Sequence, residues 1–514
     1  MHLGKKSLLV TSTLTLMTVF VYFVFRIFVL RDTLAISINA IDTVLIVAFY
    51  VGEMFILLHA GGYFYSIMRA LMRYTRPDLY YAGESTPKVT VCIPARDEPL
   101  GIVKRTLIAC SFLDYPNFEI ILLDGSDKQV NRDAYKQLCE DYQFTYYAVP
   151  EPKHGAKAGA INDCLRDVIR SHFIAVFDAD FRPSRDFLKT LVAQITETPH
   201  VAFIQTPQFY GNIDTSVVSR AAELQQSIFY EYLCEAKSAH DGLFMCGTNL
   251  LIRTSALREV GGFDETSITE DFATSLLLMR AGWVGRYYNY TAAFGDGPVN
   301  LREYFRQQYR WARGTLDLFF KNLPYILWRR GLTVGQRWEF LLSGSYYLVG
   351  LCWFVLVMLP PLYVFFRIPL YAANPYAYLL AYVPYFAMTG FLFFQTLMSR
   401  QYRAIDWLRA ESLTLLAVPI YAKAAIDTLL RNRTSFQTTR KNASRFEIPW
   451  DMFGAQVFLT VINLAAFLLG VWYLSQGSLD LPLAINTFWS AFHGFFLAFI
   501  PLEVYANARR SRTR

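Results

Sequence analysis

The chain has 514 residues, a length that predicts two or three structural units rather than one ordinary domain. Hydrophobic residues make up 54% of it and charged residues 18%, against roughly 45–50% and about 25% in soluble domains. The formal net charge is +7, and Lys and Arg gather beside apolar segments, which favours orientation in a membrane over nucleic-acid binding. The seven Cys residues form no CxxC pair and suit a reducing cytosol.

Two apolar segments near the N-terminus, 8–30 and 37–60, are each long enough to cross a bilayer. A hydrocarbon core about 30 Å thick requires roughly 20 helical residues. The first segment is too long for the core of a signal peptide and lacks a small-residue cleavage pattern, so we expect it to be retained. Residues 1–65 are therefore predicted to form two transmembrane helices.

Residues 85–325 have the pattern of a soluble α/β domain. Short apolar segments at 89–93, 119–123 and 173–177 each end in an acidic or turn residue, and helical stretches lie between them. This alternation predicts a mostly parallel sheet that binds its ligands at the carboxyl ends of the strands.

Apolar segments resume after this domain. Four of them reach the length of a membrane span, at 340–366, 374–398, 453–475 and 483–505. They predict two transmembrane helices within 338–400 and two more within 451–507.

The apolar stretch 405–430 differs from these spans because it contains Pro419 and several ionisable side chains. These are Asp406, Arg409, Glu411, Lys423 and Asp427. Charged groups are costly within hydrocarbon, so an amphipathic helix along the membrane interface is predicted here. Together with the basic segment that follows, it forms the expected unit 401–450.

The basic flanks predict the orientation. Lys5 and Lys6 precede the first span, and four Arg residues between 509 and 514 follow the last one. Because such flanks stay on the cytosolic side, both termini are expected in the cytosol. The even number of spans on each side then places the central domain and the loop 431–445 there too. We expect a multi-pass protein of the plasma or inner membrane, with the lipid bilayer as its partner.

Two carboxylates, Asp178 and Asp180, directly follow the predicted strand 173–177. Two residues apart at a strand end, both can reach a divalent cation that bridges a diphosphate. Such a cation neutralises a leaving nucleotide, as sugar transfer requires. The structural alternative is a turn or a helix cap.

Two further motifs follow in order, TED at 269–271 and QQYRW at 307–311. With the strand-end acids, and between membrane spans, they resemble the processive inverting glycosyltransferases of family 2, the cellulose, hyaluronan, chitin and poly-N-acetylglucosamine synthases. The resemblance covers nearly the whole chain. It implies an α/β GT-A-like glycosyltransferase domain inserted between transmembrane α-helices and ending in an interfacial helix. It also implies Mg²⁺ or Mn²⁺ held by Asp178 and Asp180.

The resemblance makes Asp271 the general base that removes a proton from the acceptor hydroxyl, with Glu270 supporting the acceptor site. A helix N-cap is the structural alternative for this motif. Gln307, Arg310 and Trp311 are spaced to share one helix face. Arg310 can bind the pyrophosphate beside Gln307, and Trp311 can pack on the acceptor sugar; the alternative is an interfacial helix with a Trp anchor.

Three earlier motifs match the family's nucleotide-binding segments, PARDE at 94–98, LDGS at 123–126 and HGAKAG at 154–159. They imply that Glu98, Asp124 and Lys157 contact the nucleotide-sugar. Many relatives have two consecutive acids in the second motif, where this chain has one, so Asp124 is the single candidate for uridine recognition.

Two later segments indicate which branch of the family the chain resembles. FMCGTN at 244–249 is similar to the family's FxCGS segment and implies that Cys246 and Gly247 lie near the acceptor end of the glycan. The basic loop contains a sequence similar to the FxVTxK gating loop of cellulose synthases, with Thr in place of Val. Its residues are Phe436, Thr438, Thr439 and Lys441. A loop that faces anionic lipid is the alternative.

The second span contains two acids, Asp42 and Glu53, at a spacing that places them on one helix face. Intramembrane carboxylates face a cavity or a partner, so these acids are predicted to border or support a glycan path. A paired structural acid near each interface is the alternative.

These features predict a membrane-bound processive inverting glycosyltransferase that polymerises a β-linked polysaccharide from a UDP-sugar and translocates it. The gating-loop resemblance favours UDP-glucose and a β-1,4-glucan. The growing glycan is then the acceptor. Because the chain ends soon after its last span, the resemblance assigns regulation or export to separate accessory subunits.

Three alternatives stay open at this point. The product can be hyaluronan, poly-N-acetylglucosamine, mannan or another β-glucan, since the shared motifs do not separate these sugars. A ceramide or diacylglycerol glucosyltransferase also uses the QxxRW motif but needs no channel. A non-catalytic transporter or subunit is disfavoured by the intact acids and Arg310.

Overall fold

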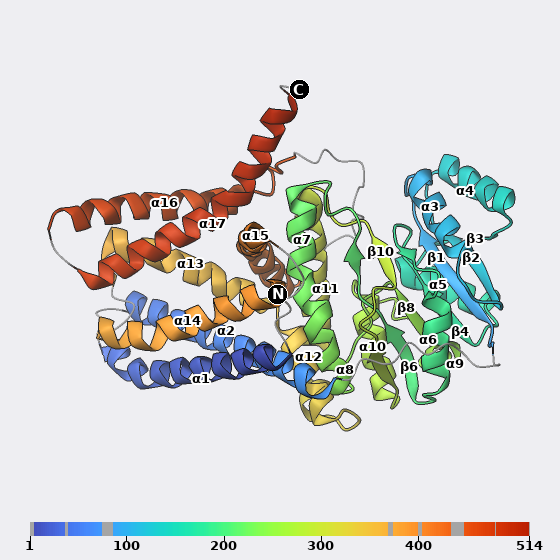
Figure 1. The fold of residues 1–514 in the computed structure, drawn as a ribbon, viewed down its shortest axis with the longest axis horizontal. Helices are drawn as coiled ribbons and strands as arrows, with labels where there is room; N and C mark the ends of the chain where they lie inside the picture. The colour runs from blue at the N-terminus through green and yellow to red at the C-terminus, as the bar shows by residue number, and fades with distance from the viewer. Residues whose placement is uncertain are drawn as a thin grey trace.

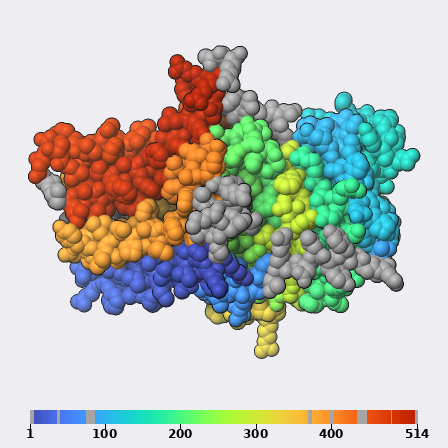
Figure 2. Space-filling view, in the orientation of Figure 1, coloured from blue at the N-terminus to red at the C-terminus, as the bar shows by residue number. Residues whose placement is uncertain are grey.

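The computed structural model describes residues 5–35, 40–74, 86–368, 374–398, 403–432, 447–477 and 480–512. Figure 1 shows an elongated molecule, with long helices from both ends of the chain at one end and an α/β domain at the other. In the space-filling view, the blue N-terminal helices and the orange to red C-terminal helices form one continuous body (Figure 2).

The α/β domain is built on a seven-stranded sheet of order β3-β2-β1-β4-β8-β6-β9. Its strands are β1 (Val89–Ala95), β2 (Phe118–Asp124), β3 (Thr145–Ala148), β4 (Phe173–Val176), β6 (Val201–Gln205), β8 (Leu250–Arg253) and β9 (Val284–Tyr287). All neighbours are parallel except β8, which is antiparallel to both β4 and β6. The sheet is therefore mixed, and the predicted parallel strands form the half that carries the acidic motifs.

The sequence of the inner strands explains why both faces of this sheet are covered. Along β2, Ile120 and Leu122 join one core, while Ile121 and Leu123 join the other. Because successive side chains of a strand point to opposite faces, an unbroken apolar strand requires helices on both sides.

Helices accordingly lie on each face of the sheet. One face packs on α3 (Leu100–Ser111), α4 (Gln129–Tyr142) and α6 (Phe187–Thr196). The other packs on α5 (Ala156–Asp167), α8 (Cys234–Ala239), α9 (Thr254–Glu259) and α10 (Glu270–Arg280). A five-residue π-helix, η1 (Phe229–Leu233), joins α7 (Val217–Ile228) to α8.

A second sheet of three short strands has the order β5-β10-β7. Its strands are β5 (Arg182–Pro183), β7 (Phe209–Tyr210) and β10 (Ala293–Gly295). It holds the segment after Asp180 close to the segment that contains Tyr210, which matters for the site below.

Seven helices of the described residues are long and apolar enough to cross a membrane. They are α1 (Lys5–Ala35), α2 (Ala40–Arg73), α13 (Leu348–Phe366), α14 (Pro375–Met398), α15 (Ala404–Leu429), α16 (Gly454–Ser475) and α17 (Leu481–Arg512). Six of them overlap the six expected spans, and α2 continues well beyond the predicted end at residue 60.

The predicted span 340–366 is divided in the structure. Its first residues belong to α12 (Val334–Gly344), and α13 begins only at Leu348. The reason is polar: Glu339 in α12 is buried and forms an ion pair with Lys237 of α8, 2.9 Å away. This contact ties α12 to the α/β domain and leaves α13 as the apolar part.

The seventh helix, α15, is the one predicted to lie along the interface. Figure 1 shows it nearly end-on, whereas α1, α14 and α16 run lengthwise across the same view. Four ionisable residues of α15 are paired, Asp406 with Arg409 at 2.9 Å and Lys423 with Asp427 at 2.6 Å. These observations agree with an interfacial helix, and its placement in a membrane stays a prediction.

The helix α11 (Leu301–Trp328) runs beside α7, between the membrane helices and the sheet (Figure 1). It packs against α15 and buries Leu301, Tyr304 and Phe305 in a core shared with α17. This position brings the QQYRW motif to the junction of the two bodies.

The acids of α2 are buried, with Asp42 8% and Glu53 7% exposed. Glu53 forms an ion pair with Arg26 Nε at 2.5 Å and accepts a hydrogen bond from the Tyr22 hydroxyl at 2.5 Å. The Arg26 guanidinium lies 4.1 Å from the centre of the Tyr50 ring. For Glu53 this contact fits the structural alternative, a paired acid, and sequence analysis had not singled out Arg26.

Candidate active site

The Asp178-Ala-Asp180 motif lies where β4 ends, at the centre of the sheet. The Asp178 N–H donates to the Thr248 hydroxyl at 2.9 Å, and the Asp178 carbonyl accepts from the Phe181 N–H at 3.0 Å. The motif thus forms a turn, as the structural alternative required, and the turn leaves the Asp178 side chain 41% exposed. Asp180 is 7% exposed.

Lys157, at the start of α5, connects these acids with residues 244–249, the predicted acceptor segment. Its ammonium group forms an ion pair with Asp178 and donates to the Gly247 carbonyl at 2.7 Å. Burial acts to lower the pKa of Lys157, but the carboxylates of Asp178, Glu270 and Asp271 outweigh it, so the pKa is raised. The side chain is therefore a permanent cation at the meeting point of three acids.

The donor set fits a divalent cation that is shared with a ligand. Within the described ranges, no group of three or more His, Cys, Asp or Glu side chains is arranged to hold a metal ion. Asp178 and Asp180 supply two carboxylates, and a Mg²⁺ ion bound by one or two carboxylates takes its other ligands from phosphates and water. Asp178 already faces a cation, the Lys157 ammonium, which shows that this carboxylate is oriented toward positive charge.

Glu270 and Asp271 form the first turn of α10. The N-cap residue, Thr269, makes no side-chain capping hydrogen bond, so the motif does not act as a cap in the manner of the structural alternative. A Cβ atom placed on Gly247 would lie 3.2 Å from Asp271 Oδ2 and 3.9 Å from Lys157 Nζ. Gly247 has a φ of +88°, and its backbone therefore passes between these two side chains.

The electrostatics of Asp271 suit a base. Burial, and after it the charge of Glu270, raise the pKa of Asp271 to about 7. Burial also raises the pKa of Glu270, which Lys157 and Arg310 act to lower. A carboxylate whose pKa lies near neutral can accept a proton in one step and release it in the next.

The acceptor segment is fixed to α10 and to the sheet. The Met245 N–H donates to Ser275 Oγ, and the Cys246 N–H donates to Gln205 Oε1, each at 2.8 Å. The rings of Phe244 and Phe272 lie edge to face, 4.6 Å apart. Gly247 is thus held beside Asp271, and the contact of Cys246 and Gly247 with the acceptor end of the glycan stays a prediction.

The helix α11 approaches the TED segment at Gly314, one turn after Arg310. A Cβ atom on Gly314 would lie 2.6 Å from Thr269 Cγ2, so only glycine allows this distance. Gln307, Arg310 and Trp311 are all half-buried. The structure thus brings the QxxRW helix and the TED segment together, and Arg310 lies close enough to influence Glu270 electrostatically.

Tyr210 accepts a hydrogen bond from Gln307 and lies close enough to Asp180 to be influenced by its charge. Gln307 Nε2 donates to the Tyr210 hydroxyl at 3.4 Å, and burial, aided by the charge of Asp180, raises the pKa of Tyr210. Sequence reasoning did not select Tyr210, nor Gly314. No local signal in the sequence indicated Tyr210, which lies in the two-residue strand β7.

The first strand ends lie together at the edge of the sheet. β1 and β2 are in register with Ala95 opposite Asp124. Both carboxylate oxygens of Asp124 accept protein hydrogen bonds, from the Ser126 N–H at 2.8 Å and from the Tyr146 hydroxyl at 2.7 Å. Glu98 is half-buried at the same edge, and its carbonyl accepts from the Tyr135 hydroxyl at 2.5 Å.

Phe436, Thr438, Thr439 and Lys441 lie outside the described residues. On either side of them the chain is attached to α11. Arg313 Nη2 donates to the Asn432 carbonyl at 2.8 Å, and Arg302 forms ion pairs with Glu447 at 2.5 Å and with Asp451 at 2.7 Å. These attachments lie on both sides of the QQYRW motif in the sequence of α11.

Residues 173–394 match the family model described as Glycosyl transferase family group 2. A cellulose synthase catalytic subunit [UDP-forming] of Pseudomonas fluorescens is 28% identical over 447 residues, which are 84% of this chain and 58% of the relative. The cellulose synthase 1 catalytic subunit of Komagataeibacter xylinus is 26% identical over 79% of this chain and 54% of its own length. A catalytic subunit of the same description from Xanthomonas axonopodis is 31% identical over 51% of this chain and 36% of its own length.

The chain thus spans about half the length of these curated relatives, or less. Among solved structures, a mannosyltransferase from Pyrobaculum calidifontis, in complex with GDP-Man and Mn2+, has a TM-score of 0.54 and 16% sequence identity. The match covers 75% of this chain and 100% of that one, which confirms the GT-A-like fold. Residues 173–394 are therefore similar to glycosyltransferases of family group 2, and most of the chain is similar to the UDP-forming cellulose synthase catalytic subunits.

Proposed function

We propose that this protein is a membrane-bound processive inverting glycosyltransferase that builds a β-linked polysaccharide from a UDP-sugar. UDP-glucose and a β-1,4-glucan are the favoured donor and product, because the curated relatives are UDP-forming cellulose synthase subunits. The observation that carries the proposal is the position of Asp271, a carboxylate of pKa about 7 beside the acceptor segment and the Lys157 cation.

The chemistry follows from this position. The acceptor hydroxyl oxygen attacks the anomeric carbon of the donor, the bond from that carbon to the UDP oxygen breaks, and the hydroxyl proton passes to Asp271. Lys157 and Arg310 supply positive charge for the diphosphate that leaves. A divalent cation, Mg²⁺ or Mn²⁺, held by Asp178 and Asp180 would add to this charge neutralisation.

Glu98 and Asp124 are proposed to border the nucleotide. For Asp124, the hydrogen bonds from Ser126 and Tyr146 hold the carboxylate in one orientation, so any contact with the base uses a fixed acceptor. Trp311, Cys246 and Gly247 are proposed to contact the terminal sugar of the glycan. Aromatic faces and backbone groups are suitable for this task because they bind a sugar without a net charge.

The proposed translocation of the glycan is based on polar aromatic side chains that extend from α11 into the helical bundle. The Tyr421 hydroxyl donates to Gln308 Oε1 at 2.6 Å, and the rings of Tyr347 and Tyr421 are 5.0 Å apart. This group of polar aromatic side chains begins one residue away from Gln307. A polar glycan crossing a bilayer needs such a shielded path, in a plasma or inner membrane and with accessory subunits as further partners.

A donor and product assay tests the proposal. Purified protein in lipid nanodiscs is supplied with radiolabelled UDP-glucose or UDP-N-acetylglucosamine and either metal, and the product is sized and digested with linkage-specific hydrolases. We expect a long product from UDP-glucose that a β-1,4-glucanase degrades. If only UDP-N-acetylglucosamine yields a product, the polymer is chitin-like or poly-N-acetylglucosamine-like rather than a glucan. A short lipid-linked product would indicate lipid glucosylation instead of polymerisation.

A further inference from the structure

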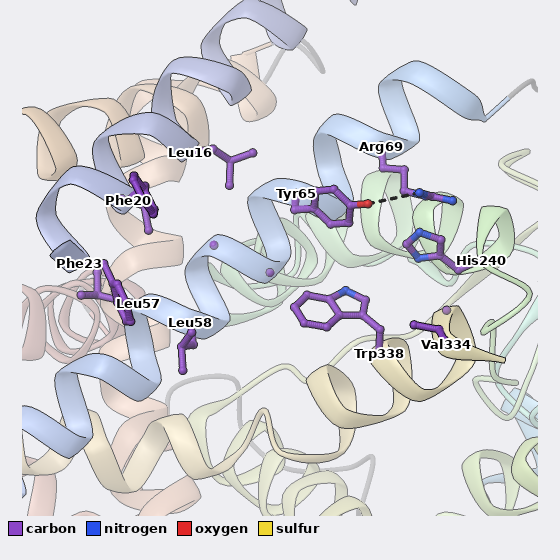
Figure 3. A pocket seen from close by; sticks show the side chains of 14 residues that line it. Leu16, Phe20, Phe23, Leu57, Leu58, Tyr65, Arg69, His240, Val334 and Trp338 are labelled. Atoms are coloured by element: carbon purple, nitrogen blue, oxygen red, sulfur yellow. Dashed lines mark hydrogen bonds between the residues drawn. The ribbon is translucent and has the colours of Figure 1, made fainter. Parts of the chain in front are cut away.

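A groove of about 700 Å³ opens between α1, α2 and α12, and none of the candidate active-site residues lines it. Figure 3 shows that its two ends differ in chemistry. One end is apolar and is lined by Leu16, Phe20, Phe23, Leu57 and Leu58. Phe20 is 67% and Leu58 59% exposed, so this end opens toward the surface that the membrane helices present to lipid.

The other end is polar and aromatic. Arg69, Tyr65, His240 and Trp338 line it (Figure 3). Arg69 Nη1 donates to the Tyr65 hydroxyl at 3.3 Å, while Arg69 Nε is buried without a hydrogen-bond acceptor in the described part of the chain. Among the same residues, no carboxylate lies within ion-pair distance of Arg69. Its positive charge is therefore available to a ligand in the groove.

The wall beside Arg69 is rigid. Glu339 is 1% exposed, and its two oxygens bind His240 Nδ1 at 2.6 Å and Lys237 Nζ at 2.9 Å. The Tyr65 ring stacks on His240 and meets Trp338 edge to face. Lys237 offsets the charge of Glu339, so the net charge at this end of the groove is the positive charge of Arg69.

The order of these groups matches the order of a membrane. The apolar end lies between two helices long enough to span a bilayer, and the polar end lies where α2 reaches α8 and α12 of the cytosolic side. Trp, Tyr and Arg are the side chains that occur at the level of lipid headgroups. Basic pockets beside membrane helices on the cytosolic side bind anionic headgroups.

We propose that this groove binds an anionic phospholipid of the cytosolic leaflet. One acyl chain lies between α1 and α2, and the phosphate accepts hydrogen bonds from Arg69. The volume is within the range of about 300–1,000 Å³ that is usual for small-molecule sites. The assignment to a phospholipid rests on charge complementarity and on the transition from apolar to polar lining along the groove.

Two adjacent glycines provide a steric test. A Cβ atom on Gly62 would lie 2.8 Å from Leu342 Cδ1, because Gly62 is where α2 packs on α12. A Cβ atom on Gly61 would have only Val19 Cγ1 near it, at 3.8 Å. Gly61 thus borders the groove, and Gly61→Leu is expected to fill part of it.

Photo-crosslinking tests the proposal with the full chain in nanodiscs of phosphatidylcholine that contain a photoactivatable phosphatidylglycerol. We expect cross-linked peptides from α1 and α2. Arg69→Gln is expected to lower capture by about tenfold, since a charge-assisted hydrogen bond is lost. Gly61→Leu is expected to lower it comparably. Arg73→Gln, which removes an exposed charge four residues later on the same helix, and Gly61→Ala are matched controls that retain capture.

Several results would overturn the proposal. These are cross-links of the unmodified protein that fall outside α1, α2 and α12, equal loss in Arg69→Gln and Arg73→Gln, or equal capture of a photoactivatable diacylglycerol that lacks the phosphate. Where a variant fails to fold, a competition experiment with the unmodified protein tests the proposal. Unlabelled phosphatidylglycerol must then displace the probe better than unlabelled phosphatidylcholine does. Free glycerol phosphate as an equally good competitor would indicate a soluble ligand instead.

Discussion

At the scale of single residues, the site consists of several carboxylates arranged around one lysine, Lys157. Lys157 lies against Asp178 and the Gly247 carbonyl, and its charge also acts on Glu270 and Asp271. Asp271 nevertheless has a pKa of about 7, because burial and the charge of Glu270 outweigh the lysine. This balance keeps one carboxyl group able to change protonation near neutral pH.

The pH dependence of activity follows from this pKa. A base acts only when deprotonated, so kcat/KM should rise with pH up to about 7 and level off above it. Asp271→Asn should lower kcat by about 10²–10⁴ and abolish this rise, since the amide accepts no proton. Initial rates of UDP release measured from pH 5 to 9 check both expectations.

Glu270→Gln serves as the matched control for that measurement. Removing the charge of Glu270 removes one cause of the raised pKa of Asp271, so the rise in activity should shift to lower pH. An Asp271→Asn variant with full activity would contradict the assignment of Asp271 as the base.

At the scale of elements, the approach of α11 to α10 includes one very close contact. Gly314 lets this helix lie directly against Thr269, next to the first turn of α10. Arg310 and Trp311 therefore reach the same side of the domain as Asp271. Because helices move as rigid bodies, a displacement at Gly314 shifts every residue of the QQYRW motif together.

Gly314→Ala should accordingly impair catalysis without removing any functional group. The added methyl meets Thr269 at 2.6 Å, so α11 must move away from α10. A shift of about 1 Å in a catalytic site can cost about 10²-fold in rate, and we expect a loss of kcat/KM approaching that size. Gly101→Ala in α3 has no atom within 4 Å of the new methyl and is expected to retain full activity. Equal activity of the two variants would contradict the importance of this contact.

At the scale of the whole molecule, α15 decides the topology. With α15 at the interface, six spans leave both termini and the α/β domain on the cytosolic side. With α15 across the membrane, its two ends would face opposite sides. Its crosswise direction relative to the other long helices and its paired charges favour the first arrangement (Figure 1).

Cysteine labelling measures this topology. Arg403→Cys and Asn432→Cys lie at the two ends of α15, and both should react with a membrane-impermeant maleimide only from the cytosolic side. Gln476→Cys, between α16 and α17, should react only from the opposite side and serves as the control. Labelling of positions 403 and 432 from opposite sides would show that α15 spans the membrane.

Sequence alone determined the features that local patterns encode. Apolar runs of sufficient length predicted the long helices, and the strand-end acids in their order predicted the GT-A-like fold and the family. It did not predict the break between α12 and α13, because the cause is an ion pair between Glu339 and Lys237, which are 102 residues apart. Arg26 escaped notice for the same reason: its partner, Glu53, lies on the neighbouring helix.

Tertiary structure alone decided which groups meet. Lys157 and the Gly247 carbonyl are 90 residues apart in the chain, and Gly314 meets Thr269 across two helices. The lipid groove likewise combines residues of α1, α2 and α12 with His240, which follows α8. Local propensity and hydrophobic periodicity carry information over a few turns, whereas such contacts depend on how whole elements pack. The motifs could therefore be recognised in the sequence. The pKa of Asp271 and the chemistry of the groove could be determined only from the fold.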